Sequence, residues 1–361
     1  MGYTGNPFSG FACGMKSKTT SFDIAYRAGV SQSTVSRALR NSPLVNEETR
    51  KRIQAIAREL HYTVDKNASN LRSQHSDTLA VLLFEDPTSD DSQINPFFLS
   101  MIGSITRACS LFGYDLLISF QQASNDWHAD FEDSRKADGI ILLGYGDYLD
   151  YAHKLHQLVE QGTHFVRWGP VFPVQPGITI GCDNYLAGRE LTEHLLLQGH
   201  RRIAFLGHAS ERYPEFFERY RGYAAALKQA GIEPDPALQV DAITTEQEGH
   251  AAMQSLLQRG EKIDAVFGAS DLIAIGAMRA IQEQGLTVPE DIAVAGFDNI
   301  PMANFVSPGL TTVLQDTKQA GDLLVRTLIH QINGEEVASC MLPAKVIIRR
   351  SCGALSQPAD D

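Results

Sequence analysis

The chain has few of the features that would place it in a membrane or outside the cell. No apolar run among its 361 residues approaches the roughly 20 that a membrane-spanning helix needs. Residues 1–15 carry no Lys or Arg, so the basic start of a secretory signal is missing. The five cysteines include no CxxC pair, which argues against structural zinc and a disulfide framework. We expect a cytoplasmic protein with reduced thiols, a disordered leader over residues 1–18, and translation from Met1 or Met15.

Catalytic and cofactor motifs are also missing. The chain has no Gly-x-Ser-x-Gly elbow, and residues 144–146 (Gly-Tyr-Gly) lack the Lys and Ser/Thr of a phosphate-binding loop. His153 and His156 have a possible metal-ligand spacing but no evident third ligand, so a surface pair is the simpler interpretation. His200 precedes a predicted strand and is interpreted as a structural connector. The sequence therefore predicts no catalytic residue, no metal, no cofactor and no enzymatic activity.

Charge is divided unevenly along the chain. The net charge of the whole chain is −12. Residues 16–72 nevertheless carry eleven Lys and Arg against five acidic residues, a net +6, which leaves −18 on the remainder. A basic segment joined to an acidic body indicates one module that meets phosphate and another that does not.

Residues 19–64 are predicted to form three short helices. Thr20 or Ser21 can cap the first helix, Gly29 allows a tight turn, and Ser31 caps a second helix over residues 32–39. Asn46 caps the third. The expected apolar contacts involve Ile24, Ala25, Ala28, Val30, Val35, Leu39, Ile53, Ile56, Ala57 and Leu60. Ala25 lies four residues before Gly29 and Val35 six after it, which is the spacing of a helix-turn-helix.

The exposed face of the second predicted helix suits DNA. Gln32, Ser33 and Arg37 offer donors and acceptors for base edges, and the neighbouring hydroxyls suit phosphates. The simpler alternative is a solvated polar face. Residues 65–76 are predicted to be a hinge, either a plain linker or a segment whose Leu71 wedges into the minor groove. The predicted DNA contacts are Ser31, Gln32, Ser33, Thr34, Arg37, Asn46, Leu71 and Arg72.

Two stretches, Gly29–Leu39 and Val45–Arg50, together with Asn70-Leu71-Arg72, closely resemble the LacI/GalR family of bacterial repressors. The resemblance implies that the second helix enters the major groove and that the residue matching Leu71 intercalates at the hinge. The family usually has Gly-Tyr-x-Pro-Asn just before the hinge, whereas residues 61–65 here are His-Tyr-Thr-Val-Asp.

After Asp77, apolar runs alternate with amphipathic stretches. Strands are expected at 79–84, 115–120, 139–143, 164–168, 178–180, 203–206, 265–268 and 292–297, with helices such as 98–111, 185–197, 218–229 and 272–284 between them. Such alternation predicts doubly wound parallel sheets. So many strands indicate two sheets, hence a two-lobed core like that of periplasmic binding proteins. We expect an effector-binding and dimerisation domain over residues 77–355, with lobe one at about 77–182 and 315–343 and lobe two at about 183–314 and 344–355.

Ligands of doubly wound folds bind beyond the carboxyl ends of the strands, which here is the cleft between the lobes. Core packing or a solvated rim is the alternative for each residue alone. The predicted effector contacts are Phe84, Asn95, Phe97, Trp168, Arg219, Ser270 and Asp298. Motifs such as Gly199–Gly207, Pro289–Ile292 and Gly296–Asp298 extend the family resemblance over this domain, and it implies effector contacts for Arg219 and Asp298. Many relatives carry an acidic residue where this chain has Gly169, and relatives often carry Asn where it has Ser270.

These observations predict a sequence-specific transcriptional regulator, a repressor of sugar-utilisation genes controlled by a small molecule. We expect a homodimer on double-stranded operator DNA with a near-palindromic site, because one head reads only a half-site. Residues 351–361 are too short for a tetramerising coiled coil. We favour induction by a sugar over corepression. A solute-binding receptor is the alternative, but it would need a signal peptide and no basic head; an α/β enzyme with a DNA-binding head would need a catalytic constellation.

Overall fold

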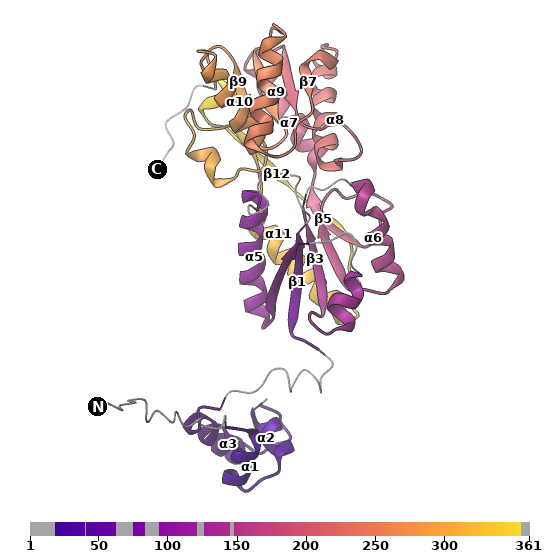
Figure 1. Cartoon of the computed structure of the whole chain (residues 1–361), viewed down its shortest axis with the longest axis vertical. Coiled ribbons are helices and arrows are strands. Elements are labelled where there is room, and N and C mark those ends of the chain that lie inside the picture. Colours follow the sequence, from indigo (N-terminus) through magenta and orange to yellow (C-terminus); the bar gives the residue numbers. More distant parts are fainter. Residues whose placement is uncertain are drawn as a thin grey trace, which may run out of the picture. The chain divides into compact units, whose positions relative to one another are not determined.

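The computed structural model describes residues 19–39, 41–62, 75–83, 94–120, 126–144 and 148–354, with only the backbone given for Leu149 and Asp150. The chain divides into two compact units, residues 1–74 and residues 75–361 (Figure 1). Leu71, Arg72 and Phe84, as well as the leader and most of the hinge, lie outside the described residues. Within the described ranges no helix combines the length and apolar character needed to cross a bilayer.

The first unit contains three helices. These are α1 (Ser21–Ala28), α2 (Gln32–Leu39) and α3 (Glu47–Glu59). Their shared core consists of Ile24, Ala25, Ala28, Val35, Ala38, Val45, Ile53 and Ala57. The predicted helix-turn-helix is confirmed, with one difference: Ala38 is fully buried, whereas Leu39 is only half-buried at the margin of the core. A small side chain at position 38 lets the helices pack closely.

Local chemistry fixes the ends of these helices. Thr20 precedes α1, and the Asp23 carboxylate accepts hydrogen bonds from the Thr20 backbone N–H and hydroxyl. Gly29 ends α1 in the left-handed region with φ of 64°, where a Cβ atom is disfavoured. Asn46 caps α3 by accepting from the Thr49 N–H at 2.8 Å. The turn and both caps therefore follow from the sequence.

Lobe one of the second unit contains a six-stranded parallel sheet with the order β11-β5-β4-β3-β1-β2. Its strands are β1 (Thr78–Leu83), β2 (Asp115–Phe120), β3 (Gly139–Leu143), β4 (Phe165–Trp168), β5 (Ile178–Cys182) and β11 (Cys340–Leu342), and its helices are α5 (Pro96–Phe112), α6 (Tyr148–Glu160) and α11 (Thr317–Ile332), with a π-helical turn at Ala129–Asp133. Helices α5 and α11 pack together on one face, and α6 covers the other (Figure 1). Because both faces are covered, β3 is a continuous apolar run, and so is β1 after Thr78.

Lobe two contains a four-stranded parallel sheet with the order β7-β6-β8-β9. Its strands are β6 (Ile203–Leu206), β7 (Gln239–Val240), β8 (Ala265–Gly268) and β9 (Ala293–Ala295), and its helices are α7 (Asn184–Leu197), α8 (Pro214–Gln229), α9 (Glu246–Gln258) and α10 (Asp271–Glu283), with 3-10 turns at Pro236–Leu238, Pro301–Asn304 and Arg350–Cys352. Helix α7 packs on α8, and α9 packs on α10.

The chain passes between the lobes three times. It crosses from β5 to α7, from β10 (Thr312–Gln315) to α11, and from β11 to β12 (Ala344–Ile347). Strands β10 and β12 pair antiparallel, so two of the crossings lie side by side. Isolated bridges join β10 to the end of β9. The crossings therefore connect directly to the strand ends where an effector is expected.

The predicted fold class is confirmed, and most predicted elements agree with the structure. Four of the strands, 115–120, 139–143, 203–206 and 265–268, have the predicted bounds. Helix α8 begins four residues earlier than expected, because Pro214 occupies its first position, where no backbone N–H is needed. Strand β9 spans only Ala293–Ala295, and the chain beyond it bridges to β10. The domain and lobe boundaries stay predictions.

Glycines allow α7 and α8 to pack backbone against backbone. A Cβ atom on Gly222 would collide with the Tyr185 carbonyl oxygen, and one on Gly188 with the Arg219 backbone. This close approach fixes the position of Arg219 on α8 relative to the start of α7.

We predict that Gly222→Ala destabilises the core domain by roughly 1–3 kcal/mol, because the helices must separate to admit the methyl group. Urea unfolding followed by circular dichroism measures the change. Gly103→Ala is the matched control: it also lies inside a helix, but nothing lies within 4 Å of the new Cβ, so stability should stay equal or rise. Equal stabilities of the two variants would contradict the packing argument.

Candidate functional sites

The outer face of α2 presents the residues predicted to read DNA. Ser33 and Arg37 are exposed, and Gln32 is half-buried, with its Nε2 donating to the Ser21 hydroxyl at 2.8 Å. The Ser31 hydroxyl lies 2.8 Å from the Thr34 hydroxyl. The structure thus gathers four hydroxyl or amide groups and one guanidinium on a single short helix.

Asn46 and α1 add two observations to this interface. The Asn46 side chain caps α3, so its amide oxygen is already used within the head. Phe22 and Tyr26 on α1 are 69% and 93% exposed. Sequence reasoning did not single them out, although they lie one turn apart and off the buried stripe that contains Ile24.

In lobe one, the wall of the cleft is formed by the start of α5 and the end of β4. Asn95 caps α5 by accepting from the Phe97 N–H at 2.9 Å. The rings of Phe97 and Trp168 lie 6.1 Å apart in a tilted arrangement. Both rings belong to the apolar core, so they form a hydrophobic floor rather than an open platform.

In lobe two, the wall contains a buried charged cluster centred on Arg219. Its Nη1 lies 3.5 Å from the Asp298 Oδ1, and neither side chain is more than 2% exposed. The Arg219 Nε donates to the Asn184 Oδ1 at 2.9 Å, and Nη1 also donates to the Ala269 carbonyl. The guanidinium carbon lies 3.8 Å from the centre of the Phe297 ring. Arg219 and Asp298, the two effector candidates that the family resemblance also implies, are therefore in contact.

Asp298 is in an unusual backbone conformation. Its φ is 108°, a region that non-glycine residues rarely adopt and that costs on the order of 1–3 kcal/mol. Its N–H donates to the Val313 carbonyl, and its Oδ1 accepts from the Gln315 Nε2 at 2.7 Å. A strained backbone like that of Asp298 often marks a functional site.

The neighbouring Asp271 is affected by the Asp298 charge. Burial and this charge raise the pKa of Asp271 well above its usual range, although hydrogen bonds from Thr312 and Ile300 act to lower it.

The lobes are closed on each other. The Asn95 Nδ2 donates across the cleft to the Thr244 hydroxyl at 3.2 Å, and that hydroxyl donates to Ser270 at 3.0 Å. A second contact joins the Tyr148 N–H to the Arg212 carbonyl at 2.8 Å. Each of the six described effector candidates is at most 9% exposed. These candidates are therefore closed off from solvent in this structure.

Sequence reasoning missed five polar residues of the cleft and its crossings: Asn184, Gln315, Thr244, Glu215 and Arg167. All of them are buried. The signal for Glu215 was its position four residues before Arg219, on the same face of one helix. For Arg167 it was a charge inside a buried strand, next to Trp168. The other three carry no local signal, because uncharged polar residues are common in loops and at helix ends.

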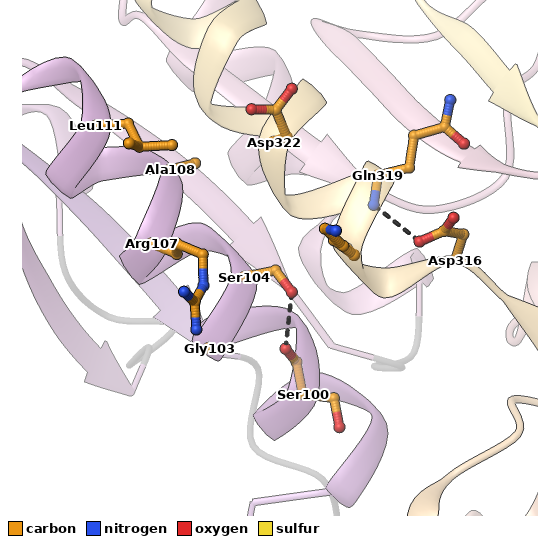
Figure 2. Close-up of a pocket in the computed structure, with 10 residues that line it drawn as sticks. Ser100, Gly103, Ser104, Arg107, Ala108, Leu111, Asp316, Gln319 and Asp322 are labelled. Atoms are coloured by element: carbon orange, nitrogen blue, oxygen red, sulfur yellow. Dashed lines mark hydrogen bonds between the residues drawn. The ribbon is translucent and has the colours of Figure 1, made fainter.

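A groove of about 810 Å³ lies elsewhere, between α5 and α11. Figure 2 shows side chains that line it, among them Ser100, Ser104 and Arg107 of α5, Gln319 of α11 and Asp316 at its N-cap. None of the predicted effector residues lines it. The described residues contain no group of three or more His, Cys, Asp or Glu placed to hold a metal ion, and the four described cysteines are free.

Comparisons with known proteins support both modules. Residues 22–65 match the profile of bacterial regulatory proteins of the lacI family, and residues 192–352 match a periplasmic binding protein-like domain. The chain is 33% identical to the HTH-type transcriptional repressor CytR of Escherichia coli (strain K12), over 92% of this chain and 96% of that protein. The chain belongs to the LacI family. It is a DNA-binding transcriptional regulator, as its relatives are, and not an enzyme.

Other relatives of this LacI-family regulator agree over nearly the whole chain. The transcriptional regulator CelR of Thermobifida fusca is 31% identical over 91% of this chain and 96% of its own length. A solved CelR–cellobiose complex superposes with a TM-score of 0.68 at 30% identity and covers 92% of this chain and 99% of that one. The lac repressor dimer bound to operator gives a TM-score of 0.79 at 24% identity and the same coverage, which supports the fold.

We predict that Arg219→Leu lowers the free energy of unfolding of the core domain by roughly 3–5 kcal/mol, because it leaves Asp298 buried without its cation. Adding Asp298→Asn to this variant should recover part of the loss, since the remaining partner is then neutral. Urea unfolding of the single and double variants tests this coupling. Additive effects of the two substitutions would contradict it.

Proposed function

We propose that this regulator is a repressor of sugar-utilisation genes, which binds a near-palindromic operator as a homodimer and is released from it by a sugar or sugar derivative in the interlobe cleft. The observation that carries the proposal is the combination, in one chain, of a helix-turn-helix whose α2 exposes Ser33 and Arg37 and a two-lobed unit with a buried Arg219–Asp298 pair. We place its action in the cytoplasm, where operator DNA is found.

The DNA-binding part of the proposal rests on α2. Arg37 can bond to two acceptors of one guanine, and Ser33 and Gln32 can bond to neighbouring base edges. Ser31 and Thr34 hydroxyls suit phosphate oxygens. Leu71 and Arg72 are proposed to enter the minor groove when the hinge is on DNA. The net +6 of residues 16–72 provides the attraction that does not depend on base sequence.

The homodimer is supported by an exposed apolar edge in lobe one. Among the described strands, β2 is the last of its sheet, and Leu117, Ile118 and Phe120 on it are 37–45% exposed. Leu111 and Phe112 at the end of α5, four and three residues before β2 in the sequence, are 76% and 38% exposed. An edge strand with exposed apolar residues on a monomer favours association, so we propose that two copies meet here. Two heads held this way can read two half-sites about one helical turn apart.

The sugar class is supported by relatives and by the chemistry of the cleft. A solved CelR complex contains cellobiose, and the ribose operon repressor of Escherichia coli (strain K12) is 30% identical to this chain over 86% of it. Asp298 can accept from paired sugar hydroxyls, and Arg219 can donate to hydroxyl oxygens. Phe97 and Trp168 offer an apolar surface for a sugar ring.

Coupling between effector and DNA is proposed to run through the crossings. Arg219 bonds to Asn184, the first residue after the crossing from β5, and Asp298 bonds to Gln315, the last residue before the crossing to α11. An effector that contacts the Arg219–Asp298 pair therefore changes the preferred angle between the lobes. A coupling free energy of roughly 1–3 kcal/mol changes operator affinity about 5–150-fold.

We predict that Arg37→Ala weakens operator binding by at least about tenfold, while binding to random duplex falls much less, because a base contact is lost. Fluorescence anisotropy at fixed salt with both duplexes measures the two affinities. Arg52→Ala, an exposed change on α3, is the control and should weaken both duplexes alike. An equal loss on both duplexes for Arg37→Ala would remove it from base readout.

We predict that Asp298→Asn lowers the affinity for the effector at least about tenfold but leaves effector-free operator affinity within about twofold. Asn tolerates positive φ and keeps the shape of the side chain, so folding should persist. A thermal-shift panel of sugars, sugar acids and nucleosides finds a binder of the unaltered protein, and its effect on operator binding follows by anisotropy. Normal release of Asp298→Asn by that binder would contradict the assigned role.

A further inference from the structure

Glu215 is a buried acid at the meeting of the two lobes. It lies in the first turn of α8, one helical turn before Arg219, and is 4% exposed. Its carboxylate reaches the end of β4 in the other lobe: a Cβ atom built on Gly169 would lie 3.4 Å from the Glu215 Oε1. A side chain at position 169 would therefore contact this carboxylate.

Arg167 faces the same space from lobe one. Its Nε donates to the Thr179 hydroxyl at 2.7 Å, and one Nη donates to the Gln175 Oε1 at 3.0 Å. Its other Nη lies 3.8 Å from the position of that Cβ atom on Gly169. Arg167 is only 2% exposed, and these two hydrogen bonds hold its guanidinium in place. A cation and an anion from opposite lobes thus lie next to position 169.

The Glu215 carboxylate is buried close to two guanidinium groups. Its own backbone N–H donates a hydrogen bond to it, which lowers the pKa of its carboxyl. Burial raises the pKa of its carboxyl, and the charges of Arg219 and Arg167 oppose this increase. Burying a carboxylate is costly, and a ligand that donates hydrogen bonds to it lowers the cost.

We propose that Glu215 is a specificity-determining residue of the effector site, accepting hydroxyl hydrogens of an uncharged polyol and excluding anionic ligands. This inference rests on the function proposed above and narrows its ligand class. The cleft contains two guanidinium groups, Arg167 and Arg219, and two carboxylates, Glu215 and Asp298, so their charges balance without the ligand. A sugar acid or sugar phosphate adds an unpaired charge next to Glu215, and this repulsion acts against the wrong ligand.

The test compares ligands that differ mainly in charge. The probes are glucose with glucuronate, galactose with galacturonate, and ribose with ribose 5-phosphate. Binding is followed by Trp168 fluorescence in a Trp127→Phe background, where Trp168 is the only tryptophan, so the signal comes from the cleft. We expect the unaltered site to bind a neutral member at least about tenfold more tightly than its anionic partner.

Variants then assign the discrimination to Glu215. Glu215→Gln should weaken the neutral probe at least about tenfold and raise the affinity for its anionic partner, whereas Glu215→Asp should keep the exclusion of the anion. Glu218→Gln is the control, because Glu218 lies on the same helix but bonds to Arg221 at the surface. The affinities of Glu218→Gln for the neutral and the anionic probe should stay within about twofold of those of the unaltered protein.

Three results would overturn the inference: preference for an anionic probe in the unaltered protein, unchanged selectivity in Glu215→Gln, or no binding of any pair. The first two leave the proposed regulator intact. If binding of a neutral probe depends on Glu215 but the bound probe does not alter operator affinity, the inference is supported. The proposed control of operator binding by a sugar is then contradicted.

Discussion

The arrangement of the strand ends in lobe two depends on one buried cation, the guanidinium of Arg219. Arg219 is fully buried, and a guanidinium without partners in such a place would be prohibitively costly. The chain provides Asn184, the Ala269 carbonyl and Asp298 as partners and the Phe297 ring beneath the guanidinium plane. These groups come from the start of α7 and from the carboxyl ends of β8 and β9, so lobe two cannot rearrange around its strand ends without breaking charged contacts.

The same contacts connect the cleft to the crossings between the lobes. Asn184 follows one crossing, and Gln315, which bonds to Asp298, precedes another. Elsewhere the lobes meet through polar contacts such as Asn95 with Thr244, which water can replace when the lobes open. The main apolar cluster contains residues of both lobes, so opening would have to keep most of this packing and break only contacts of this polar kind.

Much of the architecture could be predicted from the sequence because its signals are local. Gly29, Ser31 and Asn46 fix turns and caps by their own chemistry, and buried parallel strands such as β3 are continuous apolar runs. Arg219 and Asp298 could be placed at the cleft because strand ends converge there. Short elements such as β7, with two residues, carry no periodicity to detect. Glu215 and Arg167 could not be paired, since 48 positions and two lobes separate them and only the tertiary structure brings both to Gly169.

The central claim is that effector and operator are coupled through one equilibrium between lobe arrangements. The most direct measurement determines operator affinity with and without a saturating amount of a sugar that binds the purified protein, and then the affinity for that sugar with and without operator, in one buffer. Coupling is reciprocal, so the account predicts that both affinities change by the same factor, about 5–150-fold. A sugar that binds free and operator-bound protein equally well would contradict it.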